Sequence, residues 1–583
     1  MSATIEPIRA GGRRTGEWLY GRWPDLLIGC GLAYLLSIPL LFALSEATGM
    51  SQWPIAAVML LALLVNGPHY GATIVRVYDA REDRRKYFVF AVYLTIAIWA
   101  LFAVSTHSLW LSSALITVYA TWTPWHFAGQ NYGLSLMFLQ RRGVAVDAVT
   151  KRLVYASFVL SAVIAILAIH AGYEDFVFSP NTLAAADVPK LFAVKLPSAL
   201  AGPLKAAVGI AYLGCLGAAA ARLLRRARLR DLGPASLLVL DQALWFSVPA
   251  IFLHGSASRT EALVFSAVWV NAAHSLQYLW VTAYYAKASP AKDPARLFLW
   301  KALLAGTAVA TLPGLVMAPN LLGGFPWDAG LAATFFAVVN LHHFILDGAI
   351  WKLRDGRVAR VLLRGVATPD PGAVTPVATV RRWPRRLVWA VAALSLFVPL
   401  TEIYGRIALG SATRPEQVRR LTRALRWVGR ETTQMHQRMA ASYAHAGQHG
   451  EAIAHFQRSI ELFPTGRAYL GLGNEYRVLG QWGRALAAFE AAIASTPELA
   501  PAHLGRAQAL LTLSSGDRAQ AVTSLERALE LWPGYSKAAV VLALEYDRTG
   551  RTDLAIRTLE SSLAADKQSD AASVQRELAR LQP

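Results

Sequence analysis

The sequence is poor in charged residues and in cysteine, and each shortage excludes a class of protein. Only 16% of the 583 residues are charged while 55% are hydrophobic, a balance typical of a polytopic membrane protein rather than a soluble domain. The two cysteines, Cys30 and Cys215, lie in apolar runs, so neither a disulfide framework nor a cysteine metal motif is present. Phosphate-binding loops, G-x-S-x-G elbows and HExxH zinc-protease motifs are also missing.

Long apolar runs predict eleven membrane-spanning helices of about 20 residues each. The expected spans are residues 25–45, 54–77, 87–105, 109–139, 153–170, 201–223, 233–253, 261–285, 297–318, 327–351 and 387–404. The first run has no small-residue cleavage site behind it, so we expect a retained helix rather than a signal peptide. The predicted fold is therefore all-α, with a cytoplasmic segment at residues 1–24 and a transmembrane helical domain at residues 25–404.

The basic residues predict the orientation of these spans. The N-terminus and five of the loops hold thirty Lys and Arg, whereas the other five loops hold only Lys190, Lys195 and Arg259. Because cytoplasmic loops carry the excess of basic residues, the N-terminus is expected in the cytoplasm of a bacterium with the protein in its inner membrane. An odd number of spans then places the C-terminal domain in the periplasm, unless the last run, which contains Pro399 and Glu402, lies on the surface.

The Lys and Arg residues of these loops account for much of the net charge of +20. No recognition helix or base-stacking platform accompanies these residues, so a nucleic-acid partner is not expected.

Polarity rises after residue 404, and a sequence repeat follows a basic linker at residues 405–431. Tyr443, Ala452, Phe456 and Pro464 recur as Tyr476, Ala485, Phe489 and Pro497, and more loosely in two later copies, at a spacing close to 34 residues. The pattern resembles the tetratricopeptide repeat (TPR). The resemblance implies an α-solenoid at residues 432–583 whose concave face binds a protein or peptide partner.

Five histidines lie well inside four of the apolar runs, where a polar side chain is costly. They are His69, His126, His274, His342 and His343. All four runs cross from outside to inside, and a rise of about 1.5 Å per residue places the five imidazoles at a similar depth. Asp347 shares a helical face with His343, whereas His342 points about 100° away. Asp241 lies in the seventh run at a compatible depth.

Neutral imidazole is a common ligand of iron, copper and zinc, and carboxylates complete oxygen-activating iron sites. Amide side chains on the same helical faces could accept the other ring N–H and fix each tautomer; they are Asn66, Gln130, Asn271, Gln277 and Asn340. A single buried histidine more often bonds to a neighbouring helix. Five at one depth favour metal or haem binding, with Asp347 and Asp241 orienting ligands or moving protons. The shallower His107, His170 and His254 are expected to be interfacial.

Two of the histidine-bearing segments, Trp125-His126-Phe127-Ala128-Gly129-Gln130 and His343-Phe344-Ile345-Leu346-Asp347, resemble in style the helices of the bacterial β-carotene dioxygenases of the Brp/Blh family. The resemblance implies non-haem iron on four histidines and an apolar polyene substrate. The tandem His342-His343 and the repeat domain depart from the pattern of that family.

Three functions remain open at this point. The first is a membrane iron-dependent oxygenase or desaturase that acts on a lipid or isoprenoid, with His69, His126, His274, His342 and His343 as candidate metal ligands. The second is a protein that binds haem, or another transition metal, for electron transfer. The third is a non-enzymatic envelope assembly or transport protein that recruits partners through its repeats.

Overall fold

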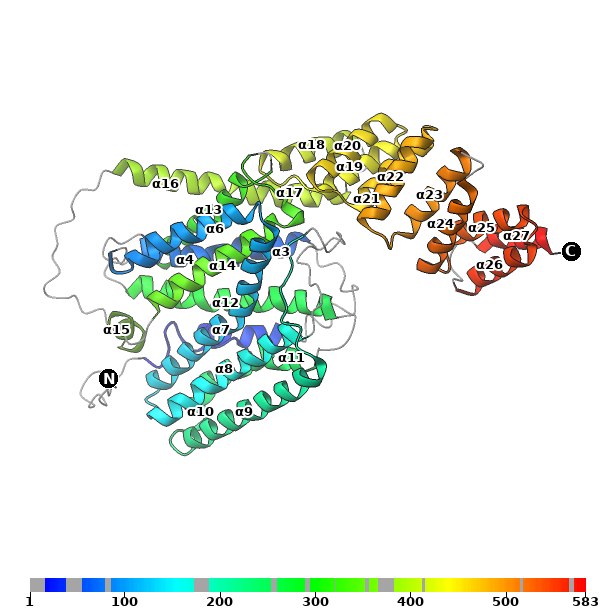
Figure 1. The fold of residues 1–583 in the computed structure, drawn as a ribbon. Helices are drawn as coiled ribbons and strands as arrows, with labels where there is room; N and C mark the ends of the chain where they lie inside the picture. The colour runs from blue at the N-terminus through cyan, green and yellow to red at the C-terminus, as the bar shows by residue number, and fades with distance from the viewer. Residues whose placement is uncertain are drawn as a thin grey trace. The chain divides into compact units, whose positions relative to one another are not determined.

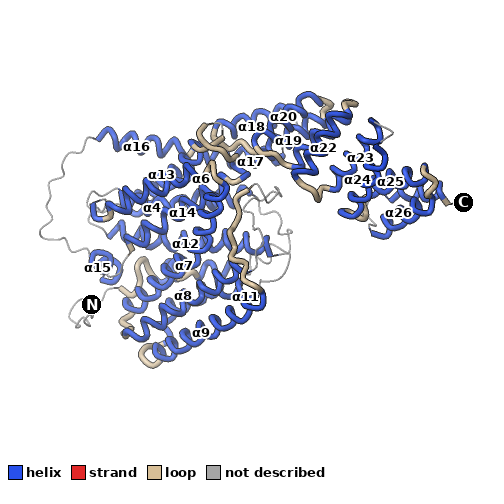
Figure 2. Tube along the Cα trace, viewed as in Figure 1, coloured by secondary structure: helices blue, strands red, loops and turns tan. Residues whose placement is uncertain are grey.

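The computed structural model of the chain describes residues 16–37, 55–78, 85–171, 188–252, 259–288, 294–319, 321–351, 356–364, 382–411, 415–513, 517–565 and 571–582. These residues form helices joined by turns, and no β-strand occurs among them (Figure 2), which confirms the all-α prediction. The chain divides into two compact units (Figure 1). The first contains Met1–Phe176, Lys190–Gly314 and Thr334–Arg406, and the second contains Val177–Pro189, Leu315–Ala333 and Ile407–Pro583.

The helices of the first unit include several π-helical turns. In chain order they are α1 (Arg22–Pro24), η1 (Asp25–Gly29), α3 (Ile55–Leu61), η3 (Ala62–Asn66), α4 (Gly67–Tyr78), η4 (Val89–Leu94), α6 (Thr95–Ser105), α7 (Leu109–Arg141), α8 (Ala148–Ala171), α9 (Ser198–Leu224), α10 (Leu229–Gln242), η5 (Ala243–Ser247), α11 (Val248–Phe252), α12 (Arg259–Ala288), α13 (Ala295–Val316), α14 (Leu331–Ile350), α15 (Gly356–Arg364), α16 (Arg382–Ser395) and α17 (Phe397–Ser411). The boundaries between the two units fall within α13, α14 and α17.

Seven helical stretches of the described residues are long and apolar enough to cross a membrane, fewer than the eleven expected. They are Val58–Tyr78, Ala148–Ala171, Ala199–Leu224, Leu229–Ile251, Ala295–Val316, Leu331–Ile350 and Arg386–Ala408, and Val89–Ser105 is a shorter apolar helix. The long helices α7 and α12 are not among the seven, and both carry polar side chains of the candidate site described below.

The first expected span, residues 25–45, is interrupted in its described part. Helix η1 ends at Gly29, and Gly31 has a φ of +76°, a value that favours glycine. A Cβ atom at Gly31 would overlap the carboxylate of Asp241, so the close approach also requires glycine. The last expected span contains a single turn residue, Leu396, between α16 and α17 and three residues before Pro399, but Arg386–Ala408 remains one of the seven stretches that could cross a membrane.

Helix α4, which carries His69, lies unusually close to α13. A Cβ atom on Gly71 would lie 1.8 Å from the Ala302 carbonyl oxygen, and one on Gly306 would lie 1.7 Å from the Gly67 carbonyl oxygen. Only glycine permits this backbone contact. The π-helical turn η3 directly precedes Gly67 and Pro68, where proline lacks the N–H of a regular helix. His69 therefore lies in the first turn of α4, a helix that backbone packing holds against α13.

The second unit contains the repeats, as four helix pairs. Its helices are α18 (Pro415–Trp427), α19 (Thr433–His445), α20 (His449–Leu462), α21 (Gly466–Val478), α22 (Trp482–Ser495), α23 (Ala500–Leu513), α24 (Arg518–Leu531), α25 (Ser536–Arg548), α26 (Thr552–Ala565) and α27 (Ala571–Leu581). Gly447, Gly480 and Gly550 have φ values of +73°, +69° and +76° and occupy the same turn in three of the pairs. Phe489 is fully buried against Gly473 and Gly505, which leave room for its ring.

The second unit also includes chain segments that join α8 to α9 and α13 to α14. The Asp328 carboxylate accepts hydrogen bonds from the Thr433 N–H at 3.3 Å and the Thr433 hydroxyl at 2.7 Å, at the start of α19. The Arg430 guanidinium lies 3.5 Å from the ring centroid of Trp327. These contacts attach the first repeat to the segment that precedes α14, an association that no sequence pattern predicted.

Candidate metal centre

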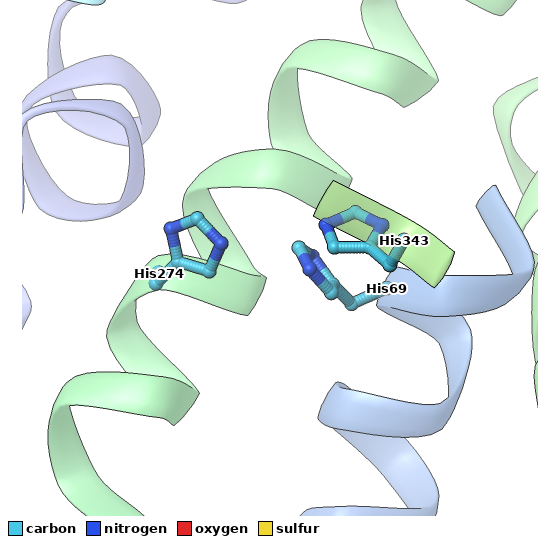
Figure 3. A group of neighbouring side chains, drawn as sticks. All are labelled: His69, His274 and His343. Carbon is cyan, nitrogen blue, oxygen red and sulfur yellow. The ribbon is translucent and has the colours of Figure 1, made fainter. Parts of the chain in front are cut away.

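Three imidazoles from three helices point toward one another inside the first unit (Figure 3). His69 of α4, His274 of α12 and His343 of α14 are almost fully buried, and one ring nitrogen from each lies within 4.8 Å of the others. The ring centroids of His69 and His343 are 4.2 Å apart, and those of His69 and His274 are 4.9 Å apart. Because a transition metal binds imidazole at about 2.0–2.1 Å, small side-chain movements would bring these nitrogens into a common coordination shell.

A second group shares His343 with the first. His126 of α7, His343 and Asp347 also offer one ligand atom each within 4.8 Å of one another. The ring of His126 lies 5.2 Å from the rings of both His274 and His343, measured between centroids. Its Nε2 atom lies 3.9 Å from a carboxylate oxygen of Asp347. The structure therefore brings four of the five predicted histidines and one predicted aspartate together.

The nitrogens in the middle of these groups have no hydrogen-bond partner among the described residues. They are His69 Nδ1, His126 Nε2, both ring nitrogens of His274, and His343 Nε2; the Asp347 Oδ1 atom is also buried without a partner. Buried polar atoms in native proteins are nearly always satisfied. A ligand bound between the rings would satisfy this set, and a metal ion matches its chemistry because imidazole nitrogen and carboxylate oxygen are metal donors.

A hydroxyl network fixes the orientation of His343. The Thr73 hydroxyl lies 3.0 Å from His343 Nδ1 and 2.6 Å from the Tyr278 hydroxyl, which accepts a 3.0 Å hydrogen bond from Trp351 Nε1. Because Thr73 contacts Nδ1 of His343, Nε2 of the same ring faces the other imidazoles. Sequence reasoning expected amides in this role, and its only signal for Thr73 was a position on the same helical face as His69.

The predicted amide side chains bond elsewhere. Asn340 Oδ1 accepts a 3.0 Å hydrogen bond from the Tyr70 hydroxyl, and Asn66 Oδ1 accepts one from Ser275 at 3.1 Å. The Gln130 amide donates to the His274 carbonyl oxygen and to Gln277 Oε1. These contacts hold helices together around the rings, and none of them reaches an imidazole nitrogen.

Aromatic rings hold two of the imidazoles in place. Phe127 stacks on His274 with centroids 3.8 Å apart and an interplanar angle of 13°, and Phe344 stacks on His126 at 4.1 Å and 22°. Each phenylalanine follows one histidine in the sequence and stacks on a histidine of another helix. The stacking restricts the planes of the two imidazoles and leaves their nitrogens free of these contacts.

Two predicted site residues lie outside both groups. His342 Nε2 lies 2.9 Å from the Thr95 hydroxyl, and its ring faces Trp99 on another side of α14, in agreement with its 100° offset from His343. Asp241 is fully buried beside Gly31, and neither of its carboxylate oxygens has a partner among the described residues. His170 bonds to Thr121, whereas His254 lies outside the described residues.

A cavity of about 330 Å³ adjoins the site. His126 and Asp347 line it together with largely apolar side chains of α7, α12, α14 and α15. Trp122, Trp125 and Phe344 lie near the histidines, and Val358 and Leu362 lie along its far part. The arrangement offers an apolar space directly beside two of the candidate ligands.

Two family models match the C-terminal part of the chain, and both describe the tetratricopeptide repeat. They match residues 470–536 and 512–578. The chain thus carries TPR repeats, as the spacing predicted, and such repeats are protein-interaction modules. Neither model reaches the helices that hold the histidines.

Several solved structures of TPR proteins are similar to part of the chain. MamA (41-end) of Desulfovibrio magneticus RS-1 shares 18% identity, covering 30% of this chain and 97% of that chain, with a TM-score of 0.25. TTC0263, a thermophilic TPR protein of Thermus thermophilus, shares 22% identity over 26% of this chain and 81% of that chain, with a TM-score of 0.23. YrrB, described as a TPR protein with an unusual peptide-binding site, shares 14% identity over 31% and 89%, with a TM-score of 0.25. No curated protein matches the sequence.

Proposed function

We propose that the chain is an integral membrane metalloprotein that binds a transition metal, foremost iron, at His69, His126, His274 and His343. The proposed activity is that of an oxygenase or desaturase acting on an apolar lipid or isoprenoid. The observation that carries the proposal is the set of buried imidazole nitrogens that face one another without partners among the described residues. The iron and the apolar substrate of this proposal are what the resemblance of two helical segments to β-carotene dioxygenases implies.

The roles of individual residues follow from their contacts. Thr73 holds Nδ1 of His343 and thereby directs Nε2 to the metal position. Asp347, beside His126, could complete the ligand set or hold a proton on its unpartnered oxygen. Iron bound to histidines would supply activation of molecular oxygen. The apolar cavity would keep water away from the reacting substrate.

Haem fits the geometry less well than a single ion. Two imidazoles that ligate one haem iron stand on opposite faces of the porphyrin, so the macrocycle must lie between the rings. The centroids of His69 and His343 are only 4.2 Å apart, and each of these rings also packs against Tyr278. The observed crowding favours a compact ion.

The sidedness of the repeats is part of the proposal. The first repeat is attached to the segments that connect α8 to α9 and α13 to α14, and these connections belong to the set of loops with few basic residues. We therefore infer that the TPR domain lies in the periplasm, on the same side as those loops. An alkaline phosphatase fusion after Pro583 should be active in a bacterial host, and an inactive fusion accompanied by an active cytoplasmic reporter at the same position would refute this placement.

The metal site is tested by elemental analysis of the detergent-purified chain. The wild type should contain close to one equivalent of iron, and His274→Ala or His343→Ala should retain less than a tenth of it. His342→Ala is the matched control, because His342 is adjacent, similarly buried and bonded to Thr95 instead. Equal metal loss in His342→Ala and His343→Ala would show that the effect is structural.

A metal-free wild-type chain would exclude the enzyme and favour the non-enzymatic alternative. In that case the repeats would carry the function, with the chain recruiting a protein or peptide partner to the membrane. The presence of TPR repeats in residues 470–578 is the observation behind this second candidate.

A further inference from the structure

The cavity beside His126 follows one face of α7. The α7 residues that line it recur every three or four positions from Trp122 to Met137, as expected for a single helical face over about four turns. At about 1.5 Å per residue this stretch is about 22 Å long. The cavity is lined largely by apolar side chains along this stretch. An elongated apolar cavity of this kind matches the shape of one extended hydrocarbon chain.

Three glycines line this cavity and leave space beside the helix backbone. Gly129 and Gly133 line it from α7 and Gly348 lines it from α14, and a Cβ atom on any of them would meet no other atom within 4 Å. Glycine inside a helix is less favourable than alanine. Close backbone packing explains Gly71 and Gly306, but it does not explain these three, whose missing side chains border empty space.

The two ends of the cavity differ. Gly129 and Gly348 are exposed, as are Trp122 and Trp125, so the cavity opens sideways between α7 and α14. At the far end, Val358 and Leu362 of α15 are buried and pack in one cluster with Met137. The cavity is therefore a channel with a lateral entrance and a closed end.

Polar atoms with no partner among the described residues mark where a reaction would occur. The His126 side chain is only 8% exposed, and its Nε2 atom has no hydrogen-bond partner in the described structure. The buried Asp347 Oδ1 atom is likewise unpartnered, and both residues line the cavity. From His126 to Met137 the helix rises about 16 Å, so the unpartnered atoms lie well away from the closed end.

We propose that this cavity binds a single extended hydrocarbon chain that enters sideways between α7 and α14. The tail of the chain occupies the end formed by Met137, Val358 and Leu362, and an internal segment lies beside His126 and Asp347. Gly133 lies between these two regions and sets how deeply the chain enters. The inference rests on the proposed function and adds the shape of its substrate and the residues that select it.

The test uses palmitic acid with a photoreactive diazirine at its terminal carbon, added to the full-length chain in phosphatidylcholine nanodiscs. After illumination, cross-linked residues are identified by mass spectrometry. We expect labelling at Met137, Val358 and Leu362, although Val358 and Leu362 are buried, in addition to general labelling of exposed residues such as Ile210 on α9.

Gly133→Leu should reduce labelling of Val358 and Leu362 at least tenfold and leave the labelling of Ile210 unchanged. The matched control is Gly217→Leu on α9, where a Cβ atom also meets nothing within 4 Å and which lies outside the cavity. No deep labelling in the wild type, or equal deep labelling in Gly133→Leu, would overturn the channel. Iron content is measured in the same samples, so a metal-free chain with intact deep labelling would refute the proposed enzyme and leave the channel standing.

Discussion

Glu431 joins the start of the first repeat to two neighbouring helices, and its replacement by glutamine should weaken that repeat. Its side chain is 5% exposed and lies 2.8 Å from His436 Nε2, 3.3 Å from Arg458 Nη2 and 3.4 Å from Arg426 Nε. A hydrogen bond to a charged group contributes about 1.5–3 kcal/mol. The two arginine side chains are 34% and 54% exposed, so solvent screening reduces their share. We expect Glu431→Gln to cost about 2–3 kcal/mol in total.

Hydrogen exchange on the full-length purified chain measures this loss locally. A cost of about 2–3 kcal/mol corresponds to about 30- to 150-fold faster exchange in α19 and α20, where opening is governed by the stability of the first repeat. Glu416→Gln is the control, because Glu416 is 76% exposed and its partner Arg420 is 4.0 Å away. Equal exchange in the two variants would refute the assignment of a stabilising role to the buried carboxylate.

Lowering the pH should remove the stabilisation that the Glu431 carboxylate provides. Burial alone would raise the pKa of Glu431, but hydrogen bonds from His436 and Arg458 outweigh it and lower the pKa from 4.5 to about 2. A lowered pKa in the folded state means that the stabilisation is complete above the unfolded-state value and is lost as the pH falls from about 4.5 through about 2. The difference between wild type and Glu431→Gln should therefore shrink over this range, and a constant difference would contradict the reasoning.

Other contacts lead to further expectations. Thr73→Val should weaken iron binding by about 10- to 100-fold in a chelator competition because His343 loses its orienting partner, whereas Thr73→Ser should retain binding. Asp328→Ala should cost about 1 kcal/mol, seen as faster exchange at the start of α19, because the first N–H groups of that helix lose their acceptor; unchanged exchange at Thr433 would count against this role. Phe489→Ala should cost about 3–5 kcal/mol and remove exchange protection from α21 to α24, since its fully buried ring joins two repeats, and an effect confined to α22 would contradict that.

The sequence was most informative where a pattern repeats. The recurrence of Tyr443 and Phe456 as Tyr476 and Phe489 predicted the TPR repeats, because each copy must place the same side chains against its neighbour. The long helical runs were also predicted, although their number and continuity were not. The bend at Gly31 depends on the approach of Asp241 from a distant part of the chain, and such a contact leaves no local signal.

The sequence predicted that imidazoles from separate helices would meet, but it did not decide whether His342 would be one of them. Spacing along a helix gives the angle between two neighbouring side chains, whereas the side that faces the other histidines depends on how the helices pack. His342 and His343 are adjacent in the chain, yet only His343 joins the group. The role of Thr73 was also missed, because a threonine in an apolar helix more often bonds to the backbone of its own helix.

The unpartnered nitrogens are the main support for the proposed metal ion. A buried polar group without a partner costs about 1–3 kcal/mol, and the group contains such atoms on His69, His126, His274 and His343. Their combined cost is comparable with the whole stability of a typical domain, about 5–15 kcal/mol. Apolar side chains of similar volume would fill the same space at no such cost, as Phe127 and Phe344 do at its edge. A ligand that binds only the folded state stabilises that state. In the proposed metalloprotein, a bound ion would offset the free energy that is lost by burying these nitrogens.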